Sequence, residues 1–284
     1  MNDLIKNIEE FCVKYNILPE SLPDILQDPK VLPMIRGKAF EFSAIAQFEK
    51  YLDKKSWKIV KPKINPQFGS SDQDVVINHL ETHINIRVEC KLAAKGRYRK
   101  VKANTENKTQ YFEIDVKCMR SRTLGSERAK QLSTKVNIPV DVIMIHNDQY
   151  LPNSFDLVVT SIANAFYETD EATGNFEWHP KEKSKEFLEK ISNKNIIDLQ
   201  DESNLKNVIF DKVYIAKSND LAALFKNNIK CTRRECKNPY SCGFIPNFPK
   251  IVFDLNTGKP LPPWFEIQDC LQVLQTFIEN QQGH

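Results

Sequence analysis

The stretch from Ile84 to Leu92 alternates between apolar and polar residues more regularly than any other part of this 284-residue chain. Its apolar members are Ile84, Ile86, Val88, Cys90 and Leu92, and the residues between them are Asn85, Arg87, Glu89 and Lys91. Successive side chains of a strand point to opposite faces of a sheet, so this period of two predicts a half-buried strand. Glu89 and Lys91 are therefore expected on the same polar face.

Further segments predict helices and short strands around this one. We expect helices at 3–15, 21–26, 36–52, 126–135, 181–190 and 264–280, and strands at 57–60, 74–77, 111–119, 140–145, 155–160 and 213–216. This alternation predicts an α/β fold with a mixed central sheet flanked by helices. A soft boundary near residue 190 would separate a core of residues 1–190, with N-terminal helices, from a C-terminal extension of residues 191–284, although the chain could also form one domain.

Two carboxylates and a lysine are expected to converge at this sheet. Asp74 stands directly before the apolar run DVVI, and a connection of hairpin length joins that run to the strand bearing Glu89 and Lys91. Carboxylate oxygens and the backbone carbonyl of Cys90 are the hard ligands that Mg²⁺ prefers. The Lys91 ammonium could position an attacking water or offset charge in a phosphoryl transition state. The group predicts metal-dependent hydrolysis of a phosphodiester.

Two other placements of the site stay open at this point. Asp72 could replace Asp74 as the metal ligand, although Asp74 lies directly against the apolar strand and would be held more rigidly. Asp115 and Lys117 also have the D-x-K form on a predicted strand, EIDVKCM. If they were the catalytic pair, Asp74 and Glu89 would be structural.

These residues resemble the PD-(D/E)XK nuclease superfamily, to which most type II restriction endonucleases belong. Gln73 and Asp74 stand at its PD position, with Gln73 in place of the nominal proline, and Glu89-Cys90-Lys91 matches its E-x-K. Glu41, in the predicted helix RGKAFEFSAIAQFEKYL, resembles the acidic residue that many members carry before the core. As a pattern of elements, the match extends over roughly residues 36–160.

The resemblance implies a restriction-endonuclease-like fold and a type II restriction endonuclease. Such an enzyme uses Mg²⁺ to cut both strands of DNA at a short specific site and leaves 5′-phosphates. Asp74, Glu89, Lys91 and Glu41 would be its catalytic residues, and the C-terminal extension would serve recognition. Cleavage of both strands at a symmetric site favours a homodimer. The rival interpretations are a repair or junction-resolving nuclease of the same superfamily and a DNA-binding protein without catalytic activity.

Basic residues are concentrated directly after the Glu89–Lys91 strand. The overall net charge of +3 says little, but 13 lysines and arginines face only 4 acidic residues between Lys91 and Lys135. A solvated basic loop and a phosphate-binding surface are both compatible with this run. Candidate contacts to double-stranded DNA are Lys95, Arg97, Arg99, Lys117, Arg120, Arg122, Arg233 and Arg234.

Three of the seven cysteines, Cys231, Cys236 and Cys242, lie close together in a loop rich in turn residues. Thiolates at this spacing suit a structural Zn²⁺ ion, but a fourth ligand is missing locally and the spacing is not the usual C-x2-C. Cys270, Cys118 or a histidine could supply it, and reduced cysteines without metal are the alternative. We expect His146 and His179 to have ordinary polar roles.

The N-terminal residues show no pattern of a secretory signal peptide, and no apolar run approaches the roughly 18 residues of a membrane span. Both observations predict a cytoplasmic protein. An odd number of cysteines without an export signal also argues against a disulfide framework.

Overall fold

A computed structural model of the chain describes residues 2–62, 73–102, 110–192 and 202–282. Its α-helices are α1 (Asn2–Lys14), α2 (Leu22–Gln27), α3 (Leu32–Tyr51), α4 (Ser126–Val136), α5 (Val140–Ile145), α6 (Glu182–Ile191), α7 (Glu202–Phe210), α8 (Ser218–Leu221) and α9 (Cys270–Gln282). Its strands are β1 (Trp57–Val60), β2 (Val75–His79), β3 (Asn85–Lys102), β4 (Gln110–Val116), β5 (Leu157–Ser161), β6 (Tyr167–Thr169), β7 (Phe176–Trp178), β8 (Val213–Lys217), β9 (Lys250–Asp254) and β10 (Phe265–Glu266).

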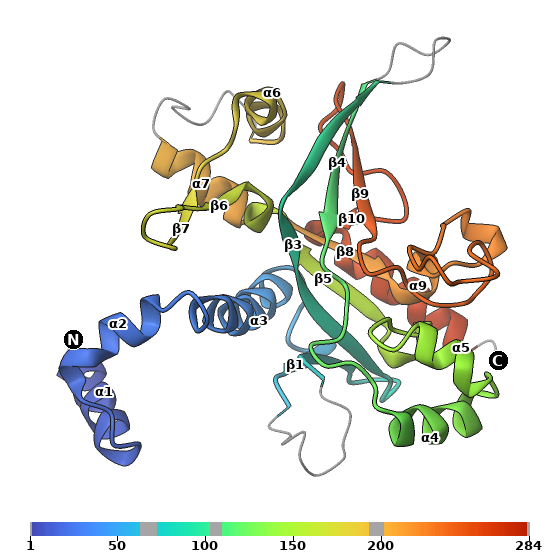
Figure 1. The fold of residues 1–284 in the computed structure, drawn as a ribbon, viewed down its shortest axis with the longest axis horizontal. Helices are drawn as coiled ribbons and strands as arrows, with labels where there is room; N and C mark the ends of the chain where they lie inside the picture. Colours follow the sequence, from blue (N-terminus) through green and yellow to red (C-terminus); the bar gives the residue numbers. More distant parts are fainter. Residues whose placement is uncertain (1, 63–72, 103–109, 193–201, 283–284) are drawn as a thin grey trace.

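Eight strands form one curled mixed sheet with helices on both faces (Figure 1). The order is β1-β2-β3-β5-β8-β10, and β4 pairs with β3 and with β9. β5 lies parallel to β3, whereas the other pairs are antiparallel. This architecture confirms the mixed central sheet flanked by helices. Strands β8, β9 and β10 come from beyond residue 190 and join the same sheet.

Strand β3 is the longest in the sheet, and its two halves pair with different strands. Its first half pairs with β2 and β5, and its second half pairs with β4 after a register shift between Ala93 and Tyr98. Gly96, with φ +68°, lies within this shift, where a side chain would be strained. Figure 1 shows β3 curving along its whole length. The curvature places the two halves of one strand in different parts of the molecule.

The basic segment after Leu92 was expected to be a loop, and in its described part this was wrong. Strand β3 continues to Lys102 and so includes Lys95, Arg97 and Arg99. Tyr98 is buried on one face of this half, while Arg99 stands opposite Glu113 of β4. Opposite charges across a strand pair stabilise the pairing, so these basic residues are compatible with a strand. Residues 103–109 of the segment, including Lys108, lie outside the described part.

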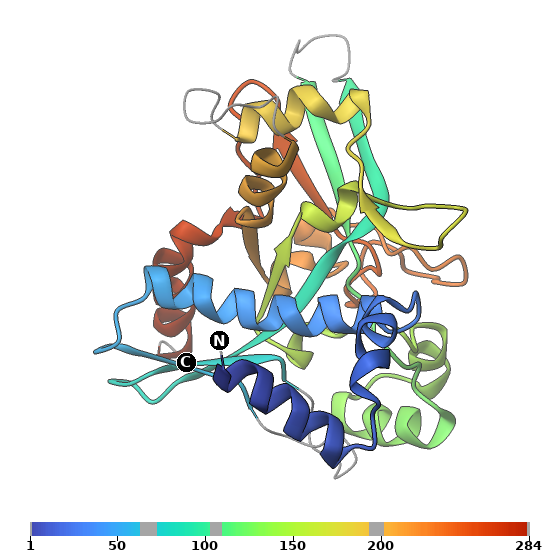
Figure 2. The same cartoon turned by 90° about the vertical axis from the view of Figure 1, so that its left-hand side faces the viewer.

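Helices α3 and α9 cover one face of the sheet and form what we call the α3–α9 core. Its largest members include Phe48 of α3, Ile86 of β3 and Leu274 of α9, all fully buried. Figure 2 shows α3 lying across the strands. Helices α3 and α9 thus pack on the same face of the sheet.

The other face of the sheet packs against α6 and α7. Phe187 of α6 stacks on Phe112 of β4 with ring centroids 4.1 Å apart, and Ile209 of α7 joins the same buried cluster. Val158 of β5 faces this cluster, whereas its neighbours Leu157 and Val159 face the α3–α9 core. The buried strand therefore contributes to both cores, as a continuous apolar run does.

Two predicted elements differ from the structure. Residues 140–145, expected to be a strand, form helix α5, in which Pro139 is the N-cap and Ile143 is the buried residue. A short apolar run cannot by itself distinguish a buried strand from such a helix. The expected helix at 264–280 begins only at Cys270, after the short strand β10. In the described ranges no helix has the length and apolar character needed to cross a membrane.

Replacing Phe48 by alanine should destabilise the fold strongly. Phe48 is fully buried between α3 and the sheet, and removal of such a ring usually costs about 3–5 kcal/mol. Phe42 on the same helix is 60% exposed and provides the control, since its replacement by alanine removes little buried surface. Urea unfolding of the two variants measures the difference. Equal loss of stability would contradict the packing described here.

Candidate active site

Asp74 and the Glu89–Lys91 segment are neighbours in the sheet. Val75 of β2 pairs with Val88 of β3, and extension of this antiparallel register by one residue brings Asp74 level with Glu89. The carboxylate oxygen Oδ2 of Asp74 accepts a hydrogen bond of 2.9 Å from the backbone N–H of Cys90. This bond fixes the Asp74 side chain against the middle of the E-x-K segment.

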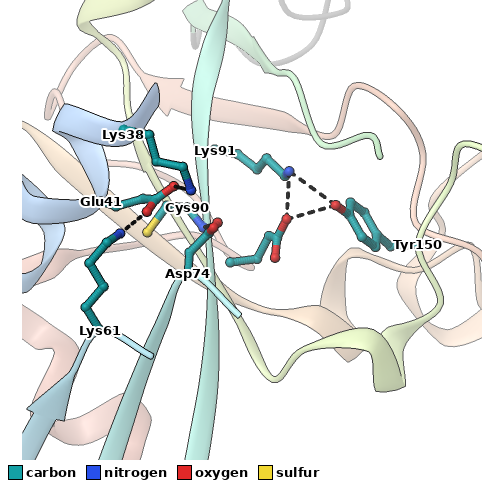
Figure 3. Close-up of polar contacts among 8 residues, drawn as sticks. Lys38, Glu41, Lys61, Asp74, Cys90, Lys91 and Tyr150 are labelled. Carbon is teal, nitrogen blue, oxygen red and sulfur yellow. Dashed lines mark hydrogen bonds and ion pairs between the residues drawn. The ribbon is translucent and has the colours of Figure 1, made fainter. Parts of the chain in front are cut away.

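Glu89 and Lys91 form a compact polar group with Tyr150 (Figure 3). The Lys91 ammonium lies 2.7 Å from Oε1 of Glu89, and the Tyr150 hydroxyl donates a hydrogen bond of 2.8 Å to the same oxygen. Lys91 also lies 3.3 Å from the Tyr150 hydroxyl. Glu89 is 8% exposed, so its charge is held by these partners rather than by solvent. The predicted placement of Glu89 and Lys91 on one face agrees with their direct contact.

Glu41 belongs to a second polar group, on the other side of β3. It lies on α3, is 5% exposed, and forms ion pairs with Lys38 at 2.6 Å and with Lys61. Figure 3 shows Lys38, Glu41 and Lys61 on one side of the strand and Lys91 and Tyr150 on the other. The charge of Glu41 raises the pKa of Asp74, and its ion pairs are with Lys38 and Lys61 rather than with Lys91.

The carboxyl group of Asp74 is unusually basic. Burial raises its pKa to about 7, and the negative charges of Glu89 and Glu41 act in the same direction. The hydrogen bond from Cys90 and the charge of Lys91 oppose the shift without cancelling it. Perturbed carboxylates of this kind are common at functional sites. Asp74 thus sits where an added positive charge would be strongly favoured.

The Lys91 side chain remains positively charged at neutral pH. Burial is the largest single effect and would lower its pKa, but the charge and hydrogen bond of Glu89, together with Tyr150 and Cys118, outweigh burial and raise the pKa above its usual value. A lysine in this state cannot take a proton from water. Its available role is electrostatic, through stabilisation of negative charge on a bound group.

The alternative site residues are placed differently. Asp115 forms an ion pair of 2.9 Å with Arg97, and the Lys117 side chain is exposed. Glu89 and Lys91 contact each other, whereas Asp115 is engaged by an arginine of the neighbouring strand. Asp72 lies outside the described residues.

The eight candidate DNA contacts fall into different settings. Lys95 hydrogen bonds to Thr169 and lies 4.5 Å from the Phe176 ring centroid, and Arg99 pairs with Glu113 at 2.6 Å. Arg233 forms an ion pair with Asp148. Three further candidates have exposed side chains: Lys117, Arg122 and Arg234. All eight stay predictions as DNA contacts.

Arg120 is the candidate nearest to the Glu89–Lys91 group. Its guanidinium carbon lies 4.7 Å from the Tyr150 ring centroid, and its Nε donates a hydrogen bond of 3.2 Å to the backbone oxygen of Gln149. Burial lowers its pKa, while Tyr150 and Glu89 act in the opposite direction. Arg120 thus adds a second cation beside Lys91.

The cysteine loop brings its three thiols together with a histidine. One ligand atom from each of His146, Cys231, Cys236 and Cys242 lies within 4.8 Å of the others. Turns within the loop support this, including a hydrogen bond of 2.6 Å from the N–H of Cys231 to the oxygen of Pro239. A histidine, not Cys118 or Cys270, completes the group, so the expectation of an ordinary polar role for His146 was incomplete. These four side chains could hold a metal ion.

No family model, curated protein or solved structure matches this chain. The superfamily resemblance therefore rests on the residues of the chain alone.

Sequence reasoning missed Tyr150, Lys38 and Lys61 as partners of the acidic residues. Lys38 stands three residues before Glu41 on a helix, a spacing that puts two side chains side by side and could have revealed the pair. Tyr150 contacts Glu89 across 61 residues of chain, in a segment without regular periodicity. No local pattern signals such a contact.

Proposed function

We propose that this chain is a Mg²⁺-dependent endodeoxyribonuclease of the PD-(D/E)XK type. The observation that carries the proposal is the arrangement of Asp74, Glu89 and Lys91. Two acidic groups meet at adjacent strands, and a lysine held in its charged form is bonded to one of them. Phosphodiester hydrolysis needs a cation site and stabilisation of developing negative charge, and these residues supply both.

Magnesium is the ion that we propose for this site. Among the described residues, the hydrogen bonds and ion pairs engage Oδ2 of Asp74 and Oε1 of Glu89, so one oxygen of each carboxylate stays available. The carbonyl of Cys90, the residue directly after Glu89 and the one whose N–H binds Asp74, is the third candidate ligand. Hard oxygen ligands of this kind, with waters and substrate phosphate, suit Mg²⁺. When bound, the ion would polarise the phosphate and lower the pKa of an attacking water.

Side chains of the protein would supply the other parts of the mechanism. Lys91, fixed by Glu89 and Tyr150, would offset the charge that develops on the phosphate oxygens. Attack of a water oxygen on phosphorus breaks the bond to the 3′ oxygen, which takes up a proton. The products are a 5′-phosphate and a 3′-hydroxyl. Arg120, beside the same tyrosine, would contact a phosphate of the bound strand.

The specific form we propose is a type II restriction endonuclease that acts as a homodimer on double-stranded DNA. Two active sites related by a two-fold axis would cut the two strands of a symmetric sequence. The proposed cleavage uses only DNA and water. A translocating enzyme, in contrast, also needs a second substrate. Light scattering of the purified protein, with and without DNA, measures the expected dimer.

Incubation of the pure protein with supercoiled plasmid tests the activity. We expect cutting with Mg²⁺, none with EDTA, and discrete fragments from a plasmid of mixed sequence. Random nicking would instead favour a repair-type nuclease of the same chemistry. If DNA is bound but remains intact with Mg²⁺ or Mn²⁺, the protein is a binding protein and the proposal fails.

A further inference from the structure

The group formed by His146, Cys231, Cys236 and Cys242 has the composition of a closed structural zinc site. Three thiols and one imidazole nitrogen are the Cys₃His set of such sites, and all six ligand-atom separations are at most 4.8 Å. In a tetrahedral site with Zn–S bonds of about 2.3 Å, sulfur atoms lie about 3.8 Å apart. The observed spacing requires only a small contraction around an ion.

The setting of His146 points independently to a ligand. Its Nδ1 lies 2.7 Å from the backbone oxygen of Val142, to which it donates, and its ring stacks on Phe244 with centroids 4.2 Å apart. The opposite nitrogen, Nε2, is buried without a hydrogen-bond partner among the described residues. Donation from one ring nitrogen fixes the tautomer and leaves the lone pair on the other for a metal. A buried polar atom without a partner is otherwise costly.

The same loop is tied to the segment that carries Tyr150. Arg233, two residues after Cys231, forms an ion pair with Asp148, and Asn247 donates a hydrogen bond of 2.9 Å to the other oxygen of Asp148. The N–H of Ile245, three residues after Cys242, donates a hydrogen bond of 2.8 Å to the backbone oxygen of Tyr150. The segment that carries the three cysteines therefore contacts residues 146–150 at Asp148, Gln149 and Tyr150.

We propose that these four residues bind one Zn²⁺ ion, and that the ion holds residues 146–150 so that Tyr150 meets Glu89 and Lys91. The first part stands on the geometry of the four ligands. The second part rests on the proposed nuclease function, because its consequence is a better-ordered active site. Tyr150 is a positioning residue in this scheme, since it contacts Glu89 and Lys91 rather than the reacting phosphate.

Metal analysis of the purified full chain tests the first part. We expect about one zinc per chain, as a closed four-ligand site requires. Replacement of Cys236 or Cys242 by serine should remove it, whereas Cys270→Ala should retain it because Cys270 lies in the separate α3–α9 core. Substitution by Co²⁺ should give the thiolate charge-transfer and tetrahedral visible bands. A chain that takes up no zinc on incubation, or Cys270→Ala losing it equally, would overturn the assignment.

Reversible removal of zinc avoids the risk that a cysteine variant fails to fold. The wild-type chain is treated with a chelator, freed of it, and divided into samples with and without added Zn²⁺. Hydrogen exchange of the peptide spanning residues 146–150 should be slower with Zn²⁺, whether or not the protein cuts DNA. Unchanged exchange in a chain that binds zinc would refute the link to Tyr150.

A cutting assay connects the ion with the proposed active site. With Mg²⁺ present, the zinc-free chain should cut DNA on the order of tenfold more slowly and recover when Zn²⁺ returns. Tyr150→Phe should show a similar loss while keeping its zinc. If neither form cuts DNA, the proposed function fails while the metal assignment stands; full cutting without zinc refutes the positioning role.

Discussion

Replacement of Lys91 by alanine is expected to slow DNA cleavage by about 10²–10³-fold, the effect of removing one preorganised charge from an active site. The Lys91 ammonium is 2.7 Å from Glu89 and stays charged at neutral pH, so its loss removes the cation that would offset phosphate charge. DNA binding should change far less. Cleavage rates and gel-shift affinities at saturating Mg²⁺ measure the two effects.

Two further variants separate catalysis from folding. Alanine at position 91 leaves the buried Glu89 without its ion-pair partner, which can cost about 3–5 kcal/mol of stability. Glu89→Gln keeps the shape and the hydrogen-bonding capacity of the side chain, and it should lose cleavage while remaining folded. Lys226→Ala is the matched control, because Lys226 is exposed and is not a candidate DNA contact, and Lys117→Ala tests the rival placement. Normal cutting by Lys91→Ala together with loss in Lys117→Ala would transfer the active site to Asp115 and Lys117.

Replacement of Asp74 by asparagine is expected to abolish Mg²⁺-dependent cleavage and, at the same time, to stabilise the metal-free protein. Burial and the charge of Glu89 raise the pKa of Asp74 to about 7, so the ionised group is unfavourable in the folded chain. An asparagine oxygen can still accept the hydrogen bond from Cys90. We expect a gain on the order of 1–3 kcal/mol at pH 8, measured by urea unfolding in EDTA.

The pH dependence gives this prediction a definite sign. Because the folded-state pKa of Asp74 lies above its ordinary value near 4, the folded protein binds this proton more tightly than the unfolded chain. The contribution of Asp74 to stability therefore falls as the pH rises from about 4 to about 7 and stays low above it. Asp74→Asn should remove that decline, whereas the exposed Asp211→Asn should keep it. A decline of the same size in Asp74→Asn would contradict the raised pKa.

The part of the site that follows strand periodicity could be predicted from the sequence. Alternation from Ile84 to Leu92 placed Glu89 and Lys91 on one face, and they contact each other. The position of Asp74 before an apolar run placed it beside them, and it bonds to Cys90. An alternation of period two is a property of one short segment. It can therefore be recognised without knowledge of the tertiary contacts.

The partners that arrive from elsewhere in the chain could not be predicted in this way. Tyr150 reaches Glu89 from a segment without periodicity, and His146 meets cysteines that lie more than 80 residues later in the chain. The end of β3 was missed for another reason. Its second half is strongly basic, but it pairs with β4, where Glu113 stands opposite Arg99. These are tertiary effects that override local composition.

The position of β5 has a consequence for the order in which the protein can fold. β5 lies between β3 and β8, and β8 begins at Val213, long after the proposed catalytic residues have been synthesised. A nascent chain that ends near residue 190 would present β5 as an open sheet edge, and the α3–α9 core would lack its second helix. Stable assembly therefore has to wait for residues 213–282. We expect the nascent chain to need a chaperone during that interval, and cleavage activity to require residues up to the end of α9.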